Sequence, residues 1–394
     1  MAIVQTGLDI LQRQSFRHLK QRAVGLLCNQ ASINHQLIHI LDVFYPASQQ
    51  GYFSLKAIFG PQHGLWGHTQ DNMIEWEGYT DPHTGIPIYS LYGQHRKPTP
   101  EMLKGLDLMV VDLQDVGARY YTFIWTLALV MEACQEQGIA VLVLDRPNPI
   151  GGEQIEGPIL HMDFRSFVGL YPIPVRHGMT IAEIARYLQQ EFFPELTLEI
   201  LPMEGWKRRY YFDDTGLTWA MPSPNVPIWE TTLVYPGMCL LEATNLSEGR
   251  GTTRPFEIFG APWMDGRDFA RRLNQLGLPG IFFRPVEFQP TFNKFQGDVC
   301  GGCFMHVTDR QQFKPFLTTL AILRETIRLY PEHFQWKSPP YEYEYEKMPF
   351  DILVGNGDLR RQLMEQVSLE EIEASWQSEL EAFRKRRHQW LLYD

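Results

Sequence analysis

The chain has 394 residues, of which 44% are hydrophobic and 13% aromatic, so it can bury a large core and we expect two domains or subdomains. Its formal net charge of −11 argues against nucleic acid and against an anionic membrane surface as partners. The first residues lack a basic region followed by an apolar one, and no apolar run approaches the length of a spanning helix, so we expect a cytoplasmic protein.

Short apolar runs and helical patterns alternate in the first part of the chain, which is typical of an α/β sheet. Buried strands are predicted at residues 23–29, 55–59, 108–113 and 139–145, with helices at residues 37–45 and 122–137. No strand is followed by G-x-G-x-x-G, and no Walker A motif occurs, so we expect neither a dinucleotide nor a nucleoside triphosphate as cofactor. Residues 1–170 are therefore predicted to form a Rossmann-like α/β domain without its nucleotide fingerprint.

The remaining residues, 171–394, are predicted to form a second domain of the α+β class. The expected elements are a helix at 180–193, a strand at 197–202, a polar loop region at 205–262, a helix at 268–276, a strand at 303–307, a helix at 311–330 and a final amphipathic helix at 368–387. The YEYEYE run at 341–346 is expected to be exposed and extended. Cys300 and Cys303 have CxxC spacing but no second pair, which favours the core of a strand over a metal or redox site, and no metal is expected.

Polar residues follow two of the predicted strands directly, at the end of a sheet where α/β proteins place their ligands. The first group is Asp112, Gln114, Asp115, Gly117 and Arg119, and the second is Asp145, Arg146 and Asn148. An equally good interpretation of each group is an Asp–Arg ion pair that pins its loop.

Residues 240–257, LLEATNLSEGRGTTRPFE, form the densest polar cluster of the chain. Glu242, Glu248 and Glu257 supply carboxylates, while Arg250 and Arg254 supply guanidinium groups that can tune them. This composition favours a pocket for a sugar or an acyl group over a polar loop held by its own salt bridges. Residues 210–225 mix aromatic side chains with Asp213, Asp214 and Asn225, which suits stacking on a sugar and also suits a proline-braced loop.

Several long motifs identify a resemblance to a bacterial family, DUF1343. They include FGPQHG at 59–64, DLQDVGARYYT at 112–122, LDRPNP at 144–149, PVRHGMT at 174–180, PSPNVP at 222–227 and EATNLSEGRGTTRPFEIFGAPW at 242–263. Members of this family are described as exo-β-N-acetylmuramidases, which remove N-acetylmuramic acid from the non-reducing end of peptidoglycan fragments. The resemblance runs from about Gly25 to the C-terminus and implies a glycoside hydrolase, with a saccharide or muropeptide substrate bound in a cleft between the two domains and no cofactor.

A glycosidase normally needs two carboxylates, and the leading acid/base candidates are Glu242 and Glu248, with Asp115 as a third option. Arg119, Arg146 and Arg250 are candidates for binding the lactyl carboxylate of muramic acid, because a guanidinium binds a carboxylate through two hydrogen bonds. The other candidates for substrate binding are Gln62, His63, Tyr121, Asp145, Asn148, His177, Asn225, Asn245 and Thr252.

One position departs from the family pattern. Members with muramidase activity commonly read Pro-Glu-His-Gly where this chain has Pro61-Gln62-His63-Gly64, and a glutamine can neither donate a proton as an acid nor act as a carboxylate nucleophile. Either another acid carries the chemistry, or the chain is a catalytically silent or altered relative that binds a saccharide or cell-wall fragment. Neighbouring substitutes for the missing carboxylate are His68, Asp71, Glu75 and Glu77.

Overall fold

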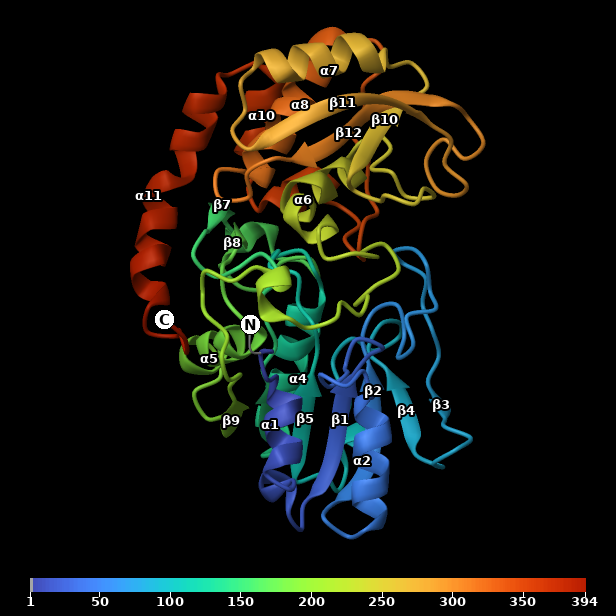
Figure 1. Cartoon of the computed structure of the whole chain (residues 1–394), viewed down its shortest axis with the longest axis vertical. Helices are drawn as coiled ribbons and strands as arrows, with labels where there is room; N and C mark the ends of the chain where they lie inside the picture. Colours follow the sequence, from blue (N-terminus) through green and yellow to red (C-terminus); the bar gives the residue numbers. More distant parts are fainter. Residues whose placement is uncertain (1–2) are drawn as a thin grey trace.

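The computed structural model describes residues 3–394, which form two units stacked along the long axis of the molecule (Figure 1). The first unit is built on a seven-stranded sheet of order β3-β4-β2-β1-β5-β6-β9. β3 pairs antiparallel with β4, and the other neighbours pair in parallel. The strands are β1 (Ala23–Cys28), β2 (Ser54–Gly60), β3 (Tyr79–Thr80), β4 (Pro87–Ser90), β5 (Leu108–Asp112), β6 (Ala140–Leu144) and β9 (Leu198–Leu201).

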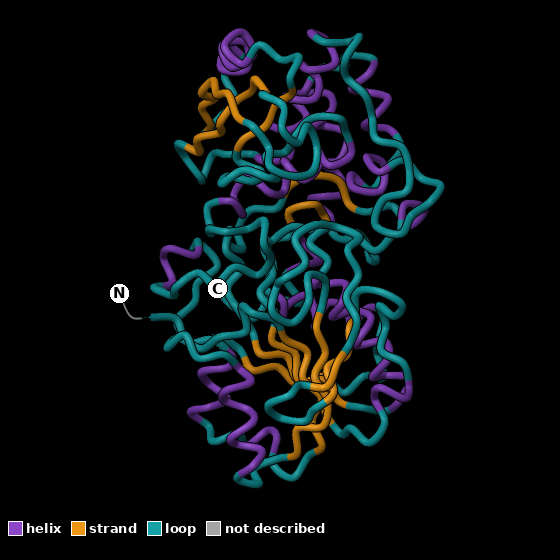
Figure 2. Tube along the Cα trace, turned by 90° about the vertical axis from the view of Figure 1, so that its right-hand side faces the viewer, coloured by secondary structure: helices purple, strands orange, loops and turns teal. Residues whose placement is uncertain are grey.

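Helices cover both sides of this sheet (Figure 2), which explains why its central strands are continuous apolar runs and why all of β5 is buried. The helices of the unit are α1 (Gly7–Arg13), α2 (Ile40–Gln49), α3 (Pro100–Leu103), α4 (Phe123–Gln137) and α5 (Ile181–Glu191). The predicted α/β class is confirmed, as are the four strands predicted between residues 23 and 145. The helix predicted at 37–45 begins later, at Ile40, because the His39 side chain caps it.

The predicted division at residues 170 and 171 is wrong. β9 pairs in parallel with β6, so α5 and β9 belong to the first sheet and not to the second unit. The connection from β6 to α5 is unusually long for a crossover, because it contains the antiparallel pair β7 (Glu156–Ile159) and β8 (Pro174–Arg176). That insertion hides the strand–helix–strand pattern in the sequence.

The second unit packs helices against a three-stranded antiparallel sheet of order β10-β12-β11. Two adjacent glycines of β12, Gly301 and Gly302, let this strand approach β10 closely. A Cβ atom at Gly302 would lie 1.9 Å from the Phe259 carbonyl oxygen. Cys300 and Cys303 are buried in β12, as the strand interpretation predicted. The elements are α6 (Thr231–Met238), β10 (Ile258–Ala261), α7 (Gly266–Gln275), β11 (Ile281–Phe288), β12 (Cys300–Val307), α8 (Pro315–Leu329), α9 (Pro349–Val354), α10 (Asp358–Met364) and α11 (Leu369–Arg387).

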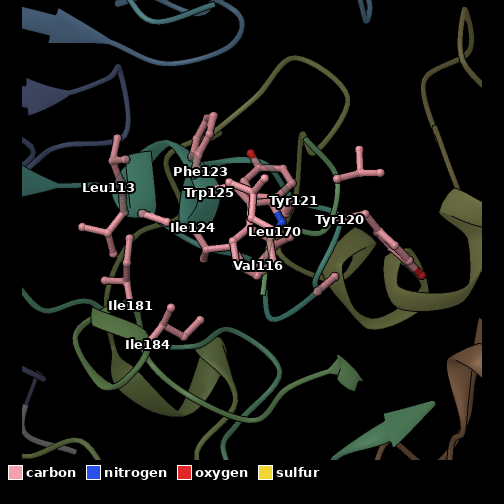
Figure 3. Close-up of a cluster of buried hydrophobic side chains, with 14 of the residues drawn as sticks. Leu113, Val116, Tyr120, Tyr121, Phe123, Ile124, Trp125, Leu170, Ile181 and Ile184 are labelled. Atoms are coloured by element: carbon pink, nitrogen blue, oxygen red, sulfur yellow. The ribbon is translucent and has the colours of Figure 1, made fainter. Parts of the chain in front are cut away.

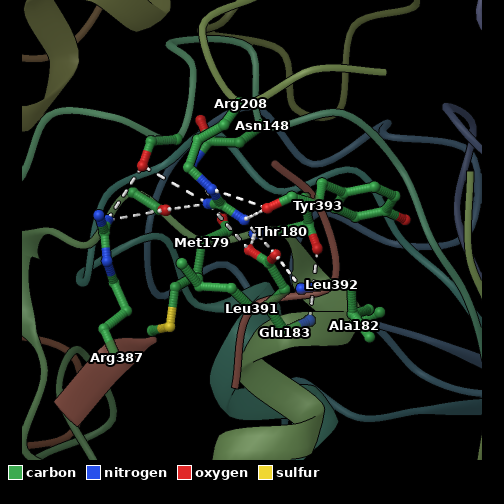
Figure 4. A network of polar contacts seen from close by, with 12 residues as sticks. Asn148, Met179, Thr180, Ala182, Glu183, Arg208, Arg387, Leu391, Leu392 and Tyr393 are labelled. Atoms are coloured by element: carbon green, nitrogen blue, oxygen red, sulfur yellow. Dashed lines mark hydrogen bonds and ion pairs between the residues drawn. The ribbon is translucent and has the colours of Figure 1, made fainter. Parts of the chain in front are cut away.

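Helix α11 runs along one side of the molecule and brings the C-terminus back beside α5 of the first unit (Figure 1). The contacts that hold this end are buried (Figure 4). Glu183 accepts from Arg208 Nη2 at 2.5 Å and from the Leu392 backbone at 2.8 Å, and Tyr393 donates to Asp145 at 2.5 Å. The last residues therefore fasten the two units together. Within residues 3–394, no helix is long and apolar enough to cross a membrane.

The Glu183–Arg208 pair predicts a large stability effect. Changing Glu183→Gln leaves the Arg208 guanidinium buried without its carboxylate, so we expect the free energy of unfolding to fall by about 3–5 kcal/mol, measured by urea denaturation. The matched control is Glu191→Gln at the other end of α5, where the carboxylate pairs with a largely exposed Arg386 and should contribute less than about 1 kcal/mol. Equal effects of the two changes would contradict the structural role of the pair.

Candidate functional site

A buried polar cavity lies between the two units, beyond the carboxyl ends of β2 and β5. Its volume is about 30 Å³, enough for a water molecule. A second cavity of about 160 Å³ adjoins it, and Asn72, Glu242, Arg250 and Tyr341 line both. We call them the inner and the outer cavity. The inner cavity is lined by Gln62, His63, Asn72, Tyr120, Tyr121, Thr122, Phe123, Val168, Ser223, Asn225 and Val226 of the first unit, and by Tyr235, Cys239, Glu242, Arg250, Phe256, Tyr341 and Glu342 of the second.

Aromatic side chains form one wall of the inner cavity. Tyr121 packs edge-to-face on Phe123 and Tyr235, and Tyr235 packs in the same way on Phe256. Figure 3 shows Tyr120 and Tyr121 among the buried apolar side chains that surround the start of α4, including Leu113, Val116 and Trp125. This packing fixes the wall, and an aromatic wall beside polar groups suits the apolar face of a sugar.

Glu242 carries a negative charge into both cavities from the short 3₁₀ helix η4 (Cys239–Ala243). Its carboxylate accepts hydrogen bonds from Tyr341 Oη at 2.6 Å, Asn72 Nδ2 at 2.7 Å and Arg250 Nη2 at 2.8 Å. Burial alone would raise the pKa of Glu242, but the Arg250 charge and these hydrogen bonds lower it below its usual value. Glu242 is therefore ionised at neutral pH.

Arg250 joins three carboxylates. Besides Glu242, its guanidinium lies 3.3 Å from Glu248 and 3.5 Å from Asp71, and Lys294 Nζ lies 2.8 Å from Glu248. Glu248 lines the outer cavity and not the inner one. Glu242 and Glu248, the two leading carboxylate candidates, therefore both contact Arg250, but only Glu242 reaches the inner cavity. Arg250 Nη1, the nitrogen that faces Asp71, is buried and makes no hydrogen bond.

Gln62 and His63 follow β2 after Pro61 and line the inner cavity. Gln62 accepts from the Thr122 hydroxyl at 2.6 Å and donates to Tyr92 Oη at 3.0 Å. His63 is 2.8 Å from the Thr69 carbonyl oxygen through Nδ1. Burial lowers the pKa of His63 to about 4, so its imidazole is neutral near pH 7.

Tyr341 and Glu342 line the inner cavity, although the YEYEYE run was expected to be exposed and extended. That prediction is wrong for these residues, because Tyr341 and Glu344 exchange backbone hydrogen bonds of 2.9 Å and fold the segment into a tight turn. Three tyrosines in six residues are unusual for an exposed segment, and this was the signal available in the sequence. Asn72 was also missed, because it lies in an irregular loop without any pattern.

Three non-glycine residues of the inner cavity have a left-handed backbone conformation. The φ angles are 72° at His63, 64° at Phe256 and 46° at Glu342, and each costs about 1 kcal/mol or more. Such costs persist only where the surrounding structure imposes them, and they gather at functional sites. Their convergence on one cavity, from segments far apart in the sequence, is evidence for function that does not depend on the charges.

Asp115, His177 and Arg119 lie outside both cavities, because each is used within the fold. Asp115 accepts from the Gly117 backbone at 2.7 Å and lies 3.2 Å from His177 Nε2. The Arg119 guanidinium is fully buried and donates to the carbonyl oxygens of Pro158, Ile173 and Leu353. This set of bonds leaves Arg119 no route to a substrate carboxylate.

The other candidates outside the two cavities also have structural partners. Arg146 pairs with Asp112, so this ion pair joins the ends of β6 and β5. Tyr121, Asn225 and Arg250 line the inner cavity. The remaining bonds are Asp145 with Thr180 and the Ala182 backbone, Asn148 with the Met179 carbonyl and the Ile150 backbone, Asn245 with the His333 carbonyl and the Gln335 backbone, and Thr252 with the Gly249 carbonyl.

The charge cluster predicts a stability change that depends on pH. Changing Arg250→Met leaves Glu242 and Glu248 buried without their shared cation, so we expect a loss of about 3–5 kcal/mol in unfolding free energy near neutral pH. The lowered pKa of Glu242 contributes stability above the ordinary glutamate pKa, and this contribution disappears as the pH falls. The loss should therefore shrink at a pH below the ordinary value of 4.5.

The measurement is urea denaturation at both pH values, with Arg254→Met as control. Arg254 is in the same segment but its side chain is 43% exposed and pairs with Glu257 at 3.3 Å, so its removal should change the stability by less than about 1 kcal/mol. A loss for Arg250→Met that does not depend on pH would show that the guanidinium does not hold these carboxylates ionised.

Two family models match almost the whole chain. Residues 24–230 match the N-terminal model of exo-beta-N-acetylmuramidase NamZ, and residues 233–393 match the C-terminal model. The models meet where α6 begins, which agrees with the first unit extending beyond β9. The sequence is also 46% identical to the peptidoglycan beta-N-acetylmuramidase NamZ of Bacillus subtilis (strain 168), over 99% of this chain and 91% of that protein.

Crystal structures of two DUF1343 family proteins from Bacteroides fragilis NCTC 9343 have the same fold. One gives a TM-score of 0.89 with 33% sequence identity and covers 100% of both chains. The other gives a TM-score of 0.76 with 28% identity, over 100% of this chain and 99% of that one. The family resemblance found in the sequence motifs is thereby confirmed.

Proposed function

The chain belongs to the exo-beta-N-acetylmuramidase NamZ family, and we propose that it is a glycosidase that releases N-acetylmuramic acid from the non-reducing end of peptidoglycan fragments. The observation that carries this function is the ionised Glu242 in a buried, partly aromatic cavity between the two units. An enclosed cavity between two units that admitted only a terminal sugar would account for an exo-acting enzyme. The substrate is a small saccharide or muropeptide.

Glu242 stabilises the positive charge that develops on the anomeric carbon when the glycosidic bond breaks. Three hydrogen bonds from Tyr341, Asn72 and Arg250 fix its carboxylate before the substrate arrives. The surroundings exclude most water, which strengthens the attraction between the carboxylate and the developing charge. Glu248, bound to the other side of Arg250, tunes this charge without reaching the inner cavity.

The cavity must widen before a sugar can enter. Its inner and outer parts measure about 30 and 160 Å³, whereas pockets that enclose a small ligand usually measure about 300 Å³ or more. The loop between β2 and β3 closes the site through Asp71 to Asn293 at 2.7 Å, Asn72 to Glu242 at 2.7 Å and Tyr343 to Glu75 at 3.0 Å. Opening of this loop would break these bonds and the Asp71–Arg250 ion pair, and it would expose Glu242.

The role of Glu242 predicts a large loss of turnover on Glu242→Gln. With 4-nitrophenyl β-N-acetylmuraminide, the wild type should release 4-nitrophenol and the variant should be slower in kcat by at least about 10². Glu230→Gln, an exposed position next to α6, serves as the control and should match the wild type. Retention of turnover by Glu242→Gln would remove Glu242 from the mechanism.

The same assay separates a second candidate function, favoured by Gln62, in which the protein binds a saccharide without cleaving it. That function predicts an inactive wild type and 4-nitrophenol release by Gln62→Glu alone. If neither protein cleaves the muraminide while the wild type cleaves an N-acetylglucosaminide, the enzyme acts on a different sugar.

Arg250 is the remaining arginine candidate for the lactyl carboxylate, because Arg119 and Arg146 are bonded elsewhere. Its position in both cavities and the absence of a hydrogen bond at Nη1 support this role. Arg250→Lys keeps the charge and loses the planar fork, so we expect the preference for N-acetylmuramic acid over N-acetylglucosamine to fall by about 1–3 kcal/mol. Calorimetric Kd values for the two sugars provide the measurement. An unchanged preference would assign the lactyl group to Lys294 or Lys337 of the outer cavity.

A further inference from the structure

We propose that Glu342 is the general acid that protonates the leaving-group oxygen, and that it supplies the carboxyl group that Gln62 lacks. This inference rests on the proposed glycosidase function and adds a residue to it. The observation behind it is the position of the Glu342 side chain, which is buried in the wall of the inner cavity and hydrogen-bonded to the Gln62 amide.

The backbone turns the Glu342 carboxyl toward Gln62. Its two oxygens accept hydrogen bonds from Tyr92 Oη at 2.9 Å and from Gln62 Nε2 at 3.3 Å. Positive φ angles of 46° at Glu342 and 66° at Tyr343 hold the turn that makes this possible. A strained turn that buries a carboxyl beside the family's characteristic motif is hard to explain by packing alone.

No lysine, arginine or histidine among residues 3–394 forms an ion pair with Glu342, whereas Glu242 is paired with Arg250. The two carboxyl groups therefore have opposite environments within one cavity. Burial and the nearby Glu242 charge raise the pKa of Glu342 to about 7, while the pKa of Glu242 is lowered. When two carboxyl groups have different pKa values, the protonated one can act as the acid and the ionised one can stabilise positive charge.

Gln62 fits this division of roles. A glutamate at position 62 would place a second carboxyl group at the same distance from Glu342, and the two would compete for one proton. The amide instead donates to Glu342 and also lies 3.4 Å from Asn72, which in turn donates to Glu242 at 2.7 Å. The two amides thus link the two carboxyl groups in one chain of hydrogen bonds.

The proposed step moves one proton and one electron pair. Glu342 transfers its proton to the glycosidic oxygen, the bond between that oxygen and the anomeric carbon breaks, and the electron pair stays on the oxygen. Glu342 becomes a carboxylate while Glu242 faces the positive anomeric carbon. Water then adds to this carbon and loses its proton to the Glu342 carboxylate, which restores the acid and completes hydrolysis.

The test compares two leaving groups, because a good leaving group needs little protonation. We expect Glu342→Gln to lower kcat by at least about 10² for the disaccharide of N-acetylmuramic acid and N-acetylglucosamine, and by less than about 10-fold for 4-nitrophenyl β-N-acetylmuraminide. Glu346→Gln is the matched control, since this glutamate belongs to the same segment and is exposed. Thermal unfolding of each variant checks that the fold is retained.

A pH profile provides a second readout. The donor must hold its proton, so kcat/KM of the wild type for the disaccharide should fall as the pH rises through about 7, and Glu342→Gln should lack this basic limb. Equal losses on the two substrates, or full activity of Glu342→Gln on the disaccharide, would overturn the assignment of Glu342 alone. A wild type that releases no N-acetylmuramic acid from either substrate would overturn the glycosidase function, and this inference with it.

Discussion

The site depends on the ion pairs that the buried Arg250 guanidinium makes with its neighbouring carboxylates. Burial would otherwise drive Glu242 and Glu248 toward their neutral forms, and one cation with several hydrogen-bonding nitrogens keeps carboxylates from different loops in place. Asp71, in the loop that closes the cavity, is also attracted to it. The positive charge of Arg250 therefore keeps Glu242 ionised and also attracts the loop that closes the cavity.

Many strongly polar residues at the strand ends serve the fold instead. The Arg146–Asp112 pair, the carbonyl ligands of Arg119 and the bonds of Asp145 anchor the long insertion and the C-terminal segment against the first sheet. A sequence shows which residues are polar, but not whether backbone groups far along the chain already satisfy them. The inner cavity lies at the carboxyl end of the sheet. The residues of the first unit that line it come from the segment after β2, from the start of α4, and from Val168, Ser223, Asn225 and Val226.

The parallel strands were predictable because helices cover both faces of the sheet and leave continuous apolar runs in the sequence. The unit boundary was not, since the pairing of β9 with β6 spans a long insertion. The cluster around Glu242 and Arg250 was recognisable by its density of charge. Glu342 was not, because its burial depends on a turn whose partner, Gln62, lies 280 residues away in the chain.

Gln62 is therefore best understood together with the residues around it. The reaction requires two carboxyl groups with different pKa values within one cavity, and it does not require either of them at a particular position in the sequence. An ionised Glu242 on Arg250 and a buried Glu342 without a cation meet that requirement. In this setting the amide of Gln62 holds the Glu342 carboxyl group in position by a hydrogen bond and does not compete for its proton, so the departure from the family motif is compatible with catalysis.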